Sequence, residues 1–523
     1  MQLSDKQPIY GTSGDMFDLL IVGGGINGVA VARDAAGRGL SVLLCERGDL
    51  GGATSSVSSK LLHGGLRYLE QFRFRMVRHA LAEREVLLAA APHIVYPLRF
   101  VLPHNPSIRP YWMIRFGIFL YDRLARRATL QDSQPLDFRL DRNPSPLRHE
   151  FERGFEYSDC WVDDARLVVL SALDARERGA EILTRTACST ATWTGSGWEV
   201  ELCDALSGAT RQVHARVIVN AAGPWAEEVA RETLELESAY RSRLVKGSHI
   251  VVPRLFADDR AFILQNDDKR IVFVLPFEGD FTLIGTTDVP YDGDPGEVRI
   301  DAAEADYLCR VATDHFTTPV SRSDVVWSFS GVRPLFDDGS SSAAKVSRDY
   351  ILEPHPAGAG DNLRALTIWG GKLTGYRLLA EEVMHQLAPT FPTLGAPWTA
   401  DARLPGGELY PTGLERFTRM LTQVYDWLPP ELASAYARRY GSLTHTVLGN
   451  ASSLDGLGRE LSAGLHAREV DYLIRHEWAR TAEDILWRRT KLGLYADMST
   501  ADELDAYIES ASTGAPGTAS KGH

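Results

Sequence analysis

The chain has 523 residues, a formal net charge of −13 and an isoelectric point near 5.6. This length allows about two to four domains with substantial cores. The net negative charge argues against a nucleic-acid partner that binds a generally positive surface. Any site for an anion must therefore be a local one.

The cysteines show no pairing or metal-binding pattern. They contain no C-x-x-C spacing and no histidine-rich neighbourhood, so we expect neither a disulfide framework nor a metal site. A reducing, cytoplasmic compartment fits this usage best. The five are Cys45, Cys160, Cys188, Cys203 and Cys309.

The two ends of the chain are expected to lie outside the folded domains. Residues 1–16 are a polar leader without the apolar core of a signal peptide, and no run approaches the roughly 18 apolar residues of a membrane span. Residues 511–523 have the composition of a disordered tail.

Residues 17–46 have the pattern of strand, glycine turn, helix and strand. Residues 17–22 are a continuous apolar run, as in a parallel strand buried on both faces. Gly23, Gly25 and Gly28 then form G-x-G-x-x-G, which allows a tight turn, close approach of a pyrophosphate and packing of helix on strand. The unit predicts a dinucleotide site at a helix N-terminus.

Glu46 is expected to define the ribose end of that site. It ends a second strand at 41–45, where a carboxylate can accept both hydroxyls of an adenosine ribose. This position favours an unphosphorylated ribose. The alternative is a solvated residue at a strand end, which the spacing from Gly28 disfavours. A nicotinamide enzyme would share this motif, but the purified protein would then be colourless.

Residues 51–70 are rich in glycine and hydroxyl side chains and then become basic. Such a run allows close backbone approach to a ligand, and its hydroxyls can bind phosphate or ring carbonyl oxygens. An ordinary Ser/Gly loop is the alternative, but the segment begins beside the ribose carboxylate. Its polar candidates are Lys60, His63, Arg67 and Tyr68.

Two helices are expected next. Residues 75–91 have helical periodicity and are followed by Pro92. Residues 113–127 are largely apolar with a basic end, which leaves two hypotheses open: a buried helix, or a helix lying in a membrane surface. The arginines concerned are Arg115, Arg123, Arg126 and Arg127.

The middle of the chain alternates between helix and strand patterns. Strong alternation after residue 249 predicts an antiparallel sheet inserted between two halves of the dinucleotide domain. We expect a helix at 163–178, strands at 182–193, 197–203 and 211–219, and sheet strands at 249–253, 270–276 and 280–287.

Two cations stand on tight turns in the second half of the chain. Arg333 lies between Gly331 and Pro334, and Lys372 follows two glycines at the start of a helix expected at 374–387. Each could be an ordinary surface residue or ion pair. Guanidinium and ammonium groups are also the donors that a phosphate monoester requires. A Pro/Gly-rich boundary at 401–412 precedes helical patterns at 413–508.

Several long motifs together resemble one enzyme family, the FAD-dependent, respiratory glycerol-3-phosphate dehydrogenases. They are GGGINGVAVARDAAGRGLSVLLCE, ATSSVSSKLLHGGLRYLE, RGFEYSDCWVDDARLV, VKGSHIVVP, ILQNDDKRIVFVLPFEGDFTLIGTTD, SGVRPL and GGKLTGYR. The resemblance covers about residues 17–400 in order, and the remainder more loosely.

The resemblance implies an α/β fold in which a glucose-oxidase-like, Rossmann-type FAD-binding domain is interleaved with an antiparallel-sheet substrate cap. An α-helical C-terminal domain follows. The expected boundaries are 17–90 with 150–235 and 325–400 for the FAD-binding domain, 91–149 with 236–324 for the cap, and 401–510 for the helical domain.

The resemblance also assigns a site. His63, Arg67, Tyr68, Arg333 and Lys372 are expected to line the substrate, with the general base left open. The expected FAD contacts are Gly23, Gly25, Ile26, Asn27, Gly28, Glu46, Arg47, Thr54, Ser55, Ser58, Ser59, Leu61, His63, Gly64, Ala187, Gly223, Gly371, Lys372, Leu373 and Thr374.

The activity that the resemblance implies is oxidation of sn-glycerol 3-phosphate to dihydroxyacetone phosphate, with electrons passed from FAD to a membrane quinone. The protein would sit peripherally on the inner face of the cytoplasmic membrane, and a homodimer is left open. The alternatives are a glycerophosphate oxidase using oxygen, an amino-acid oxidase of the same fold, and a flavin-binding module without turnover. Several nearby cations favour a phosphate over a carboxylate.

Overall fold

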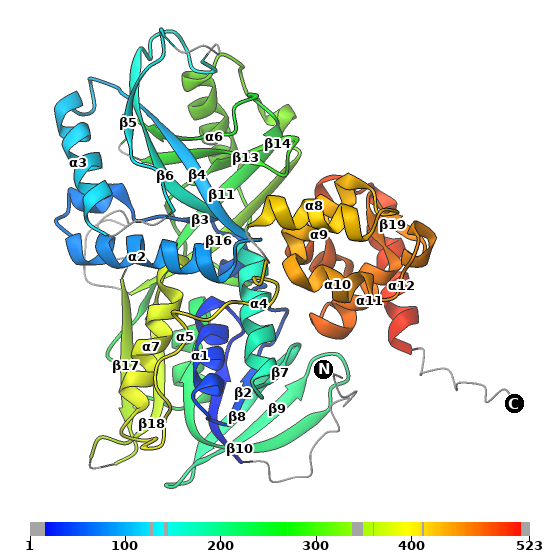
Figure 1. Cartoon of the computed structure of the whole chain (residues 1–523). Helices are drawn as coiled ribbons and strands as arrows, with labels where there is room; N and C mark the ends of the chain where they lie inside the picture. The colour runs from blue at the N-terminus through cyan, green and yellow to red at the C-terminus, as the bar shows by residue number, and fades with distance from the viewer. Residues whose placement is uncertain are drawn as a thin grey trace, which may run out of the picture.

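The structure, a computed structural model, describes residues 16–125, 129–140, 145–268, 270–336, 349–358, 360–409 and 413–513. Figure 1 shows three bodies: a lower one around a largely parallel sheet, an upper one around a second sheet, and a helical one in orange and red beside both. The predicted leader, up to residue 15, and the tail from residue 514 lie outside the described ranges.

The first sheet has the strand order β17-β18-β10-β1-β2-β7. β1 is central and pairs in parallel with both β10 and β2, which explains its continuous apolar sequence. β9 extends the sheet from β10 and carries β8. The strands are β1 (Met16–Val22), β2 (Val42–Cys45), β7 (Glu181–Leu183), β8 (Thr186–Trp193), β9 (Trp198–Asp204), β10 (Thr210–Asn220), β17 (Tyr350–Pro356) and β18 (Leu363–Gly370).

Three helices share a hydrophobic core with this sheet: α1 (Ile26–Gly37), α4 (Asp164–Glu177) and α7 (Tyr376–Leu387). Asp163 caps α4 by accepting a hydrogen bond from the N–H of Arg166. The starts of these helices lie at the carboxyl ends of the central strands. Open α/β sheets bind their ligands at this edge.

The second sheet has the order β15-β11-β14-β13-β12-β4-β6-β3, with β16 on β11 and β5 on β6. α6 (Ala302–His315) packs on one face, and α2 (Phe74–Ala90) and α3 (Tyr111–Arg123) pack on the other. The strands are β3 (Leu61–Leu62), β4 (Val95–Pro103), β5 (Gln134–Asp137), β6 (Arg153–Val162), β11 (Ser242–Pro253), β12 (Ala261–Gln265), β13 (Ile271–Phe277), β14 (Phe281–Gly285), β15 (Val289–Pro290) and β16 (Trp327–Phe336).

The helical body has its own hydrophobic core. Its elements are α8 (Leu414–Val424), α9 (Pro430–Tyr440), α10 (Thr444–Leu448), the hairpin of β19 (Glu460–Ser462) and β20 (Leu465–His466), α11 (Ala467–His476), the π-helix η10 (Asp484–Arg489) and α12 (Met498–Thr513).

The structure differs from the expected elements at several points. The strand expected at 182–193 is broken into β7 and β8, because Arg185 has a φ of +53°. The helix expected at 113–127 ends at Arg123, and residues 126–128 lie outside the described ranges. β6 and β16, expected in the FAD-binding part, pair within the second sheet. α12 extends into the segment expected to be a disordered tail.

Candidate active site

The turn between β1 and α1 brings backbone segments into very close contact. Gly23 has a φ of +112°, which L side chains rarely adopt, and a Cβ added to Gly28 would lie 1.9 Å from the Gly23 carbonyl oxygen. Gly25 caps α1, and the N–H of Ile26 donates to Ser55 Oγ at 2.9 Å. The start of α1 therefore offers N–H donors and a hydroxyl to a cofactor phosphate.

Glu46 follows β2 directly, and its carboxylate is already oriented. The N–H groups of Gly24 and Gly48 donate to its two oxygens at 2.7 and 2.6 Å. Burial raises the pKa of Glu46, and these hydrogen bonds only partly offset it. The N–H of Thr186, next to the predicted contact Ala187, donates to the Glu46 carbonyl oxygen at 2.8 Å. A carboxylate fixed in this way fits the ribose-binding position.

Two further predicted cofactor contacts lie near this end of the site. Arg47 follows Glu46 and its guanidinium carbon lies 4.0 Å from the centre of the Trp225 ring, a cation–π contact. Gly223 begins the short 3-10 helix η3 (Gly223–Trp225) after β10, with a φ of +57°. The Arg47–Trp225 contact therefore joins the segment after β10 to the residue that follows Glu46.

The hydroxyl-rich loop after β2 is braced on several sides. Each of its predicted cofactor-binding hydroxyls has a protein partner in the structure, so the loop is held in place before any ligand is considered. Thr54 Oγ1 donates to the Val332 carbonyl at 2.6 Å, Ser58 Oγ donates to Asp164 Oδ2 at 2.7 Å, and Ser59 Oγ lies 2.9 Å from His249 Nε2.

The loop continues through β3 toward the predicted substrate residues. Leu61 is buried in β3, and the half-buried His63 ring lies 5.9 Å from the ring of Phe273. The N–H of Gly64 donates to the Tyr121 hydroxyl of α3 at 2.8 Å. The backbone around His63 is therefore anchored to the second sheet and its covering helix.

A second helix start lies beside the first. β18 ends at Gly370 and is followed by Gly371, with φ values of +78° and +103°. The carbonyl of Gly370 accepts from Asn27 Nδ2 at 3.1 Å. Leu373 and the buried Thr374 follow in a 3-10 turn that leads into α7. Asn27 Oδ1 is buried and has no hydrogen-bond partner in the part of the chain described. An orphaned acceptor between two helix starts fits a bound cofactor that donates to it.

Lys372 extends from this turn toward the segment after β3. Its Nζ lies 4.1 Å from the centre of the Tyr68 ring and 3.2 Å from Met76 Sδ. Tyr68 belongs to the 3-10 helix η2 (Leu66–Leu69). The side chain of Arg67, in the same helix, lies outside what the structure describes.

Arg333 lies on β16 and reaches across the neighbouring strand. Its Nη1 lies 3.1 Å from Asp288 Oδ1, and its Nη2 donates to Thr286 Oγ1 at 3.1 Å. A Cβ on Gly247 would lie 2.6 Å from Arg333 Nη2, so a larger residue at this position of β11 would displace the guanidinium. The guanidinium is therefore held flat against β11, with a carboxylate and a hydroxyl fixing its orientation.

The two predicted cations come from strands of different sheets that meet here. A Cβ on Gly370 would lie 3.5 Å from the carbonyl oxygen of Pro334, the residue after Arg333. Val332 is tied to Thr54 in the cofactor loop. The turn expected at Arg333 is part of strand β16, because Arg333 pairs with Val245 of β11. The structure therefore brings this part of β16 and the turn that carries Lys372 side by side, next to the start of α1.

The structure adds His249 to the candidate site, together with Asp288 and Thr286. His249 is 2% exposed and its ring stacks on Phe329 with 4.8 Å between centres. Burial lowers the pKa of His249, and the charges of Arg333 and a nearby lysine lower it further. Sequence reasoning treated this histidine only as part of a strand. Its placement between Ser248 and a β-branched run gave no sign that it faces the loop.

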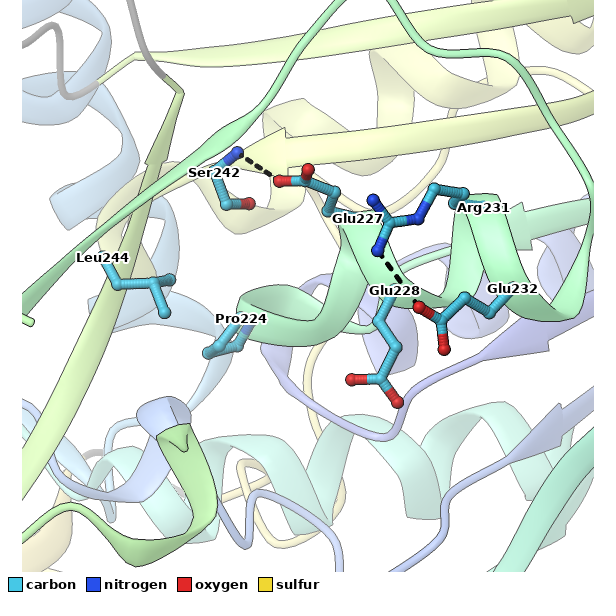
Figure 2. Close-up of a pocket in the computed structure, with 7 residues that line it drawn as sticks. All are labelled: Pro224, Glu227, Glu228, Arg231, Glu232, Ser242 and Leu244. Carbon is cyan, nitrogen blue, oxygen red and sulfur yellow. Dashed lines mark hydrogen bonds and ion pairs between the residues drawn. The ribbon is translucent and has the colours of Figure 1, made fainter. Parts of the chain in front are cut away.

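One cavity near the candidate site does not suit a phosphate ligand. Figure 2 shows it beside η3 and β11, lined by carboxylates; Glu227 accepts from the N–H of Ser242 at 3.1 Å, and Arg231 pairs with Glu232. The cavity measures about 340 Å³. Its glutamates outnumber its single arginine, so it would repel a phosphate dianion.

Comparison with known proteins agrees with these features. A family described as FAD dependent oxidoreductase matches residues 18–372, and one described as the C-terminal domain of alpha-glycerophosphate oxidase matches residues 397–513. A glycerol-3-phosphate dehydrogenase of Pseudomonas aeruginosa is 52% identical over 95% of this chain and 96% of its own length. A D-erythritol 1-phosphate dehydrogenase of Brucella abortus is 50% identical over 94% of this chain and 97% of its own length.

A solved structure extends the likeness to three dimensions. The glycerol-3-phosphate dehydrogenase of Bacillus halodurans, crystallised with FAD, aligns with a TM-score of 0.74 at 28% identity, covering 94% of this chain and 89% of that one. The predicted fold class and the predicted cofactor are thereby confirmed.

The glycine turn, the fixed ribose carboxylate and the match over residues 18–372 define the class of the protein: it is an oxidoreductase that uses FAD. Within that class, the chain belongs to the family of FAD-dependent glycerol-3-phosphate dehydrogenases.

Proposed function

We propose that the protein oxidises sn-glycerol 3-phosphate to dihydroxyacetone phosphate and passes the electrons to a membrane quinone. The observation that carries this proposal is the meeting of strand β16, which bears Arg333, and the turn that bears Lys372, beside the start of α1. A phosphate dianion needs several charge-assisted donors when it leaves water. The names of the similar enzymes of P. aeruginosa and B. abortus also specify polyol phosphates.

Arg333 is suited to orient the phosphate. A guanidinium is planar and carries five N–H donors, so a group oriented by Asp288 and Thr286 presents those donors in a defined direction. Lys372 contributes a point charge from the other turn, and the ring of Tyr68 restricts its ammonium group. Together they account for discrimination between a phosphorylated polyol and the free polyol.

The proton step requires a neutral base within the site. As hydride leaves the secondary carbon, the hydroxyl proton must be accepted by a protein group. When bound, FAD supplies the two-electron acceptor. His63 and His249 are the candidate bases. His63 suits the role better, because it is only half-buried. His249 is 2% exposed and burial lowers its pKa, which makes it a weaker base, so it is better suited to hold Ser59 Oγ at 2.9 Å.

The other functions make different demands on the site. D-erythritol 1-phosphate shares the phosphate and the secondary alcohol, so it is the second candidate substrate. An amino-acid oxidase needs only one cation for a carboxylate, and the pair of Arg333 and Lys372 argues against it. A glycerophosphate oxidase would carry out the same reductive half-reaction and differ only in the acceptor.

The helix α3 supports docking on a membrane surface. Its inner face buries Ile114, Ile118 and Tyr121, while Trp112 and Phe116 are 70% and 60% exposed. Large aromatic side chains on the outer face of a helix with basic residues are typical of interfacial helices. Phe72 and Phe74, at the neighbouring start of α2, are also exposed, as are Met113, Phe119, Arg115 and Arg123 of α3.

No helix within the described ranges is long and apolar enough to cross a membrane. We therefore propose peripheral attachment through α3 and the adjoining aromatic residues, which would place quinone within reach. The homodimer stays a prediction, and sedimentation of the FAD-loaded protein with and without detergent tests it.

The proposed function is tested by anaerobic bleaching of the bound flavin. Glycerol 3-phosphate, D-erythritol 1-phosphate, glycerol and glycine are each mixed with oxidised protein, and loss of flavin absorbance is followed. We expect rapid bleaching by glycerol 3-phosphate and little by glycerol or glycine. Faster bleaching by D-erythritol 1-phosphate would assign the second substrate, and bleaching only by glycine would overturn the proposal.

The acceptor is tested on the reduced protein. We expect a short-chain quinone to reoxidise the flavin much faster than air-saturated buffer does. Equal or faster reoxidation by oxygen, with hydrogen peroxide as product, would assign an oxidase instead.

A further inference from the structure

The loop that follows the ribose carboxylate is fastened to the C-terminal helical body through one buried residue, Asp49. It is 4% exposed and lies shortly after Glu46. Arg489 Nη2 donates to Asp49 Oδ1 at 2.8 Å, and Arg488 Nε donates to Oδ2 at 2.6 Å. Arg185 Nη1 donates to Oδ1 at 3.0 Å. Arg488 and Arg489 belong to η10, far along the chain from Asp49.

A second carboxylate completes the arrangement. Asp484, at the start of η10, accepts from Arg185 Nη2 and from Arg488 Nη2, each at 2.5 Å. We call these residues the Asp49 cluster: Asp49, Arg185, Asp484, Arg488 and Arg489. Its two acids face three arginines, and Glu483, 70% exposed, pairs with Arg488 at 2.8 Å to balance the third charge.

The cluster is charged and well paired. Burial raises the pKa of Asp49, but the charges of Arg489, Arg488 and Arg185 outweigh burial and hold that pKa below its ordinary value. Buried ion pairs are a weak source of stability compared with apolar packing, but they fix geometry. The geometry fixed here is that of the ribose-binding loop.

Arg185 connects the cluster to Glu46 through the backbone. Its own N–H donates to the Gly48 carbonyl at 2.9 Å, and the N–H of Gly48 donates to the Glu46 carboxylate at 2.6 Å. The N–H of Gly51 donates to the Gly24 carbonyl at 3.0 Å, which ties the same loop to the glycine turn. A shift of Asp49 would therefore displace both the Glu46 carboxylate and the glycine turn between β1 and α1.

We propose that Arg488 and Arg489 are positioning residues for the cofactor: through Asp49 they hold Glu46 in the orientation that accepts the adenosine ribose, so the C-terminal helical body sets the affinity for FAD. This role does not depend on which polyol phosphate is oxidised. It assigns a function to a body whose residues do not otherwise line the candidate site.

The test uses the full-length apoprotein and two variants of the cluster. Arg488→Gln removes one donor to Asp49, and Arg489→Lys keeps the charge but loses the bidentate fork. The matched control is Glu477→Gln, which disrupts another buried bridge between the same two bodies: Arg166 of α4 donates to Glu477 at 2.9 Å, and both side chains are fully buried. The Glu477 side chain does not contact residues 46–49 in the structure. The Glu477 backbone carbonyl, which accepts from Arg489 Nη2 at 2.7 Å, is unchanged in this variant.

FAD affinity is measured by quenching of flavin fluorescence, well below the melting temperature of each apoprotein. We expect Arg488→Gln and Arg489→Lys to raise the Kd for FAD about tenfold. Glu477→Gln should lower the melting temperature but leave that Kd within about twofold of wild type. Hydrogen exchange of η10 should slow when FAD is added to the wild-type apoprotein, because linkage is reciprocal.

Two results would overturn the proposal. One is a Kd for FAD within about twofold of wild type in both folded cluster variants. The other is an equal loss of FAD affinity in Glu477→Gln, which would mean that any weakening of the contact between the bodies has the same effect. Arg489→Lys retains the buried charge, so we expect this variant to keep the fold and to serve for the comparison.

Discussion

Replacement of Arg333 is the most informative single perturbation of the proposed substrate site. Arg333→Ala removes the planar guanidinium and takes away the cation 3.1 Å from Asp288. The expected effect on catalysis comes from the lost contact between Arg333 and the substrate phosphate, because losing one partner of a desolvated, hydrogen-bonded charge pair costs about 2–5 kcal/mol. Because the Arg333 side chain is 26% exposed, we expect the lower half of that range. This corresponds to a fall in kcat/KM of about 30- to 400-fold.

Arg333→Lys should cost less, about tenfold, because the charge remains while the fork is lost. The assay is anaerobic stopped-flow reduction of the flavin by glycerol 3-phosphate, with FAD content and melting temperature measured on the same samples. Arg270→Ala is the control, since Arg270 forms an exposed pair with Asp268 at 3.0 Å. Wild-type kinetics in Arg333→Ala would refute the reasoning, as would a loss of activity that follows loss of FAD and of stability.

Three other predictions follow from particular contacts. Gly28→Ala should abolish tight FAD binding in a flavin-content assay, because the added Cβ would lie 1.9 Å from the Gly23 carbonyl oxygen. The control variant Gly117→Ala should bind FAD normally, because the space around Gly117 is open. Replacing Trp112 and Phe116 together by aspartate should weaken sedimentation with anionic vesicles, whereas Gly117→Ala on the same helix should not. Burial lowers the pKa of His93 to about 3, below its value in the unfolded chain. The neutral, buried imidazole therefore contributes its full stabilisation above pH about 6.5, and this stabilisation is lost as pH falls and the unfolded chain binds a proton. Urea unfolding should show about 2 kcal/mol less stability at pH 5 than at pH 7, and His93→Leu should reduce that difference.

Local pattern was sufficient for the cofactor half of the fold. The central strand β1 is apolar at every buried position, and Gly23 and Gly28 after it are required by backbone distances that a Cβ would not tolerate. These are short-range constraints, so they can be read directly from residue order. The break at Arg185 was not predictable in this way, because an arginine in a left-handed conformation is stabilised by its side-chain contacts to Asp49 and Asp484.

The substrate half depends on long-range pairing. Arg333 and Lys372 were candidates because each was expected on a glycine-rich turn, although Arg333 lies within β16. Their proximity follows from β16 joining the second sheet while β18 belongs to the first. His249 was missed for the same reason, since only the pairing of β11 with β16 brings it against Phe329 and the cofactor loop. The Asp49 cluster likewise joins residues that no local pattern connects.

The central claim is that Arg333 recognises the phosphate of a polyol phosphate, and a substrate–variant cycle tests it most directly. Anaerobic flavin reduction is measured for wild type and Arg333→Ala, each with glycerol 3-phosphate and with glycerol. The account predicts that Arg333→Ala lowers kcat/KM for glycerol 3-phosphate by about 30-fold or more and leaves the slow reaction with glycerol unchanged. An equal fall for both substrates would contradict it, because the arginine would then act on the reacting carbon or on the fold and not on the phosphate.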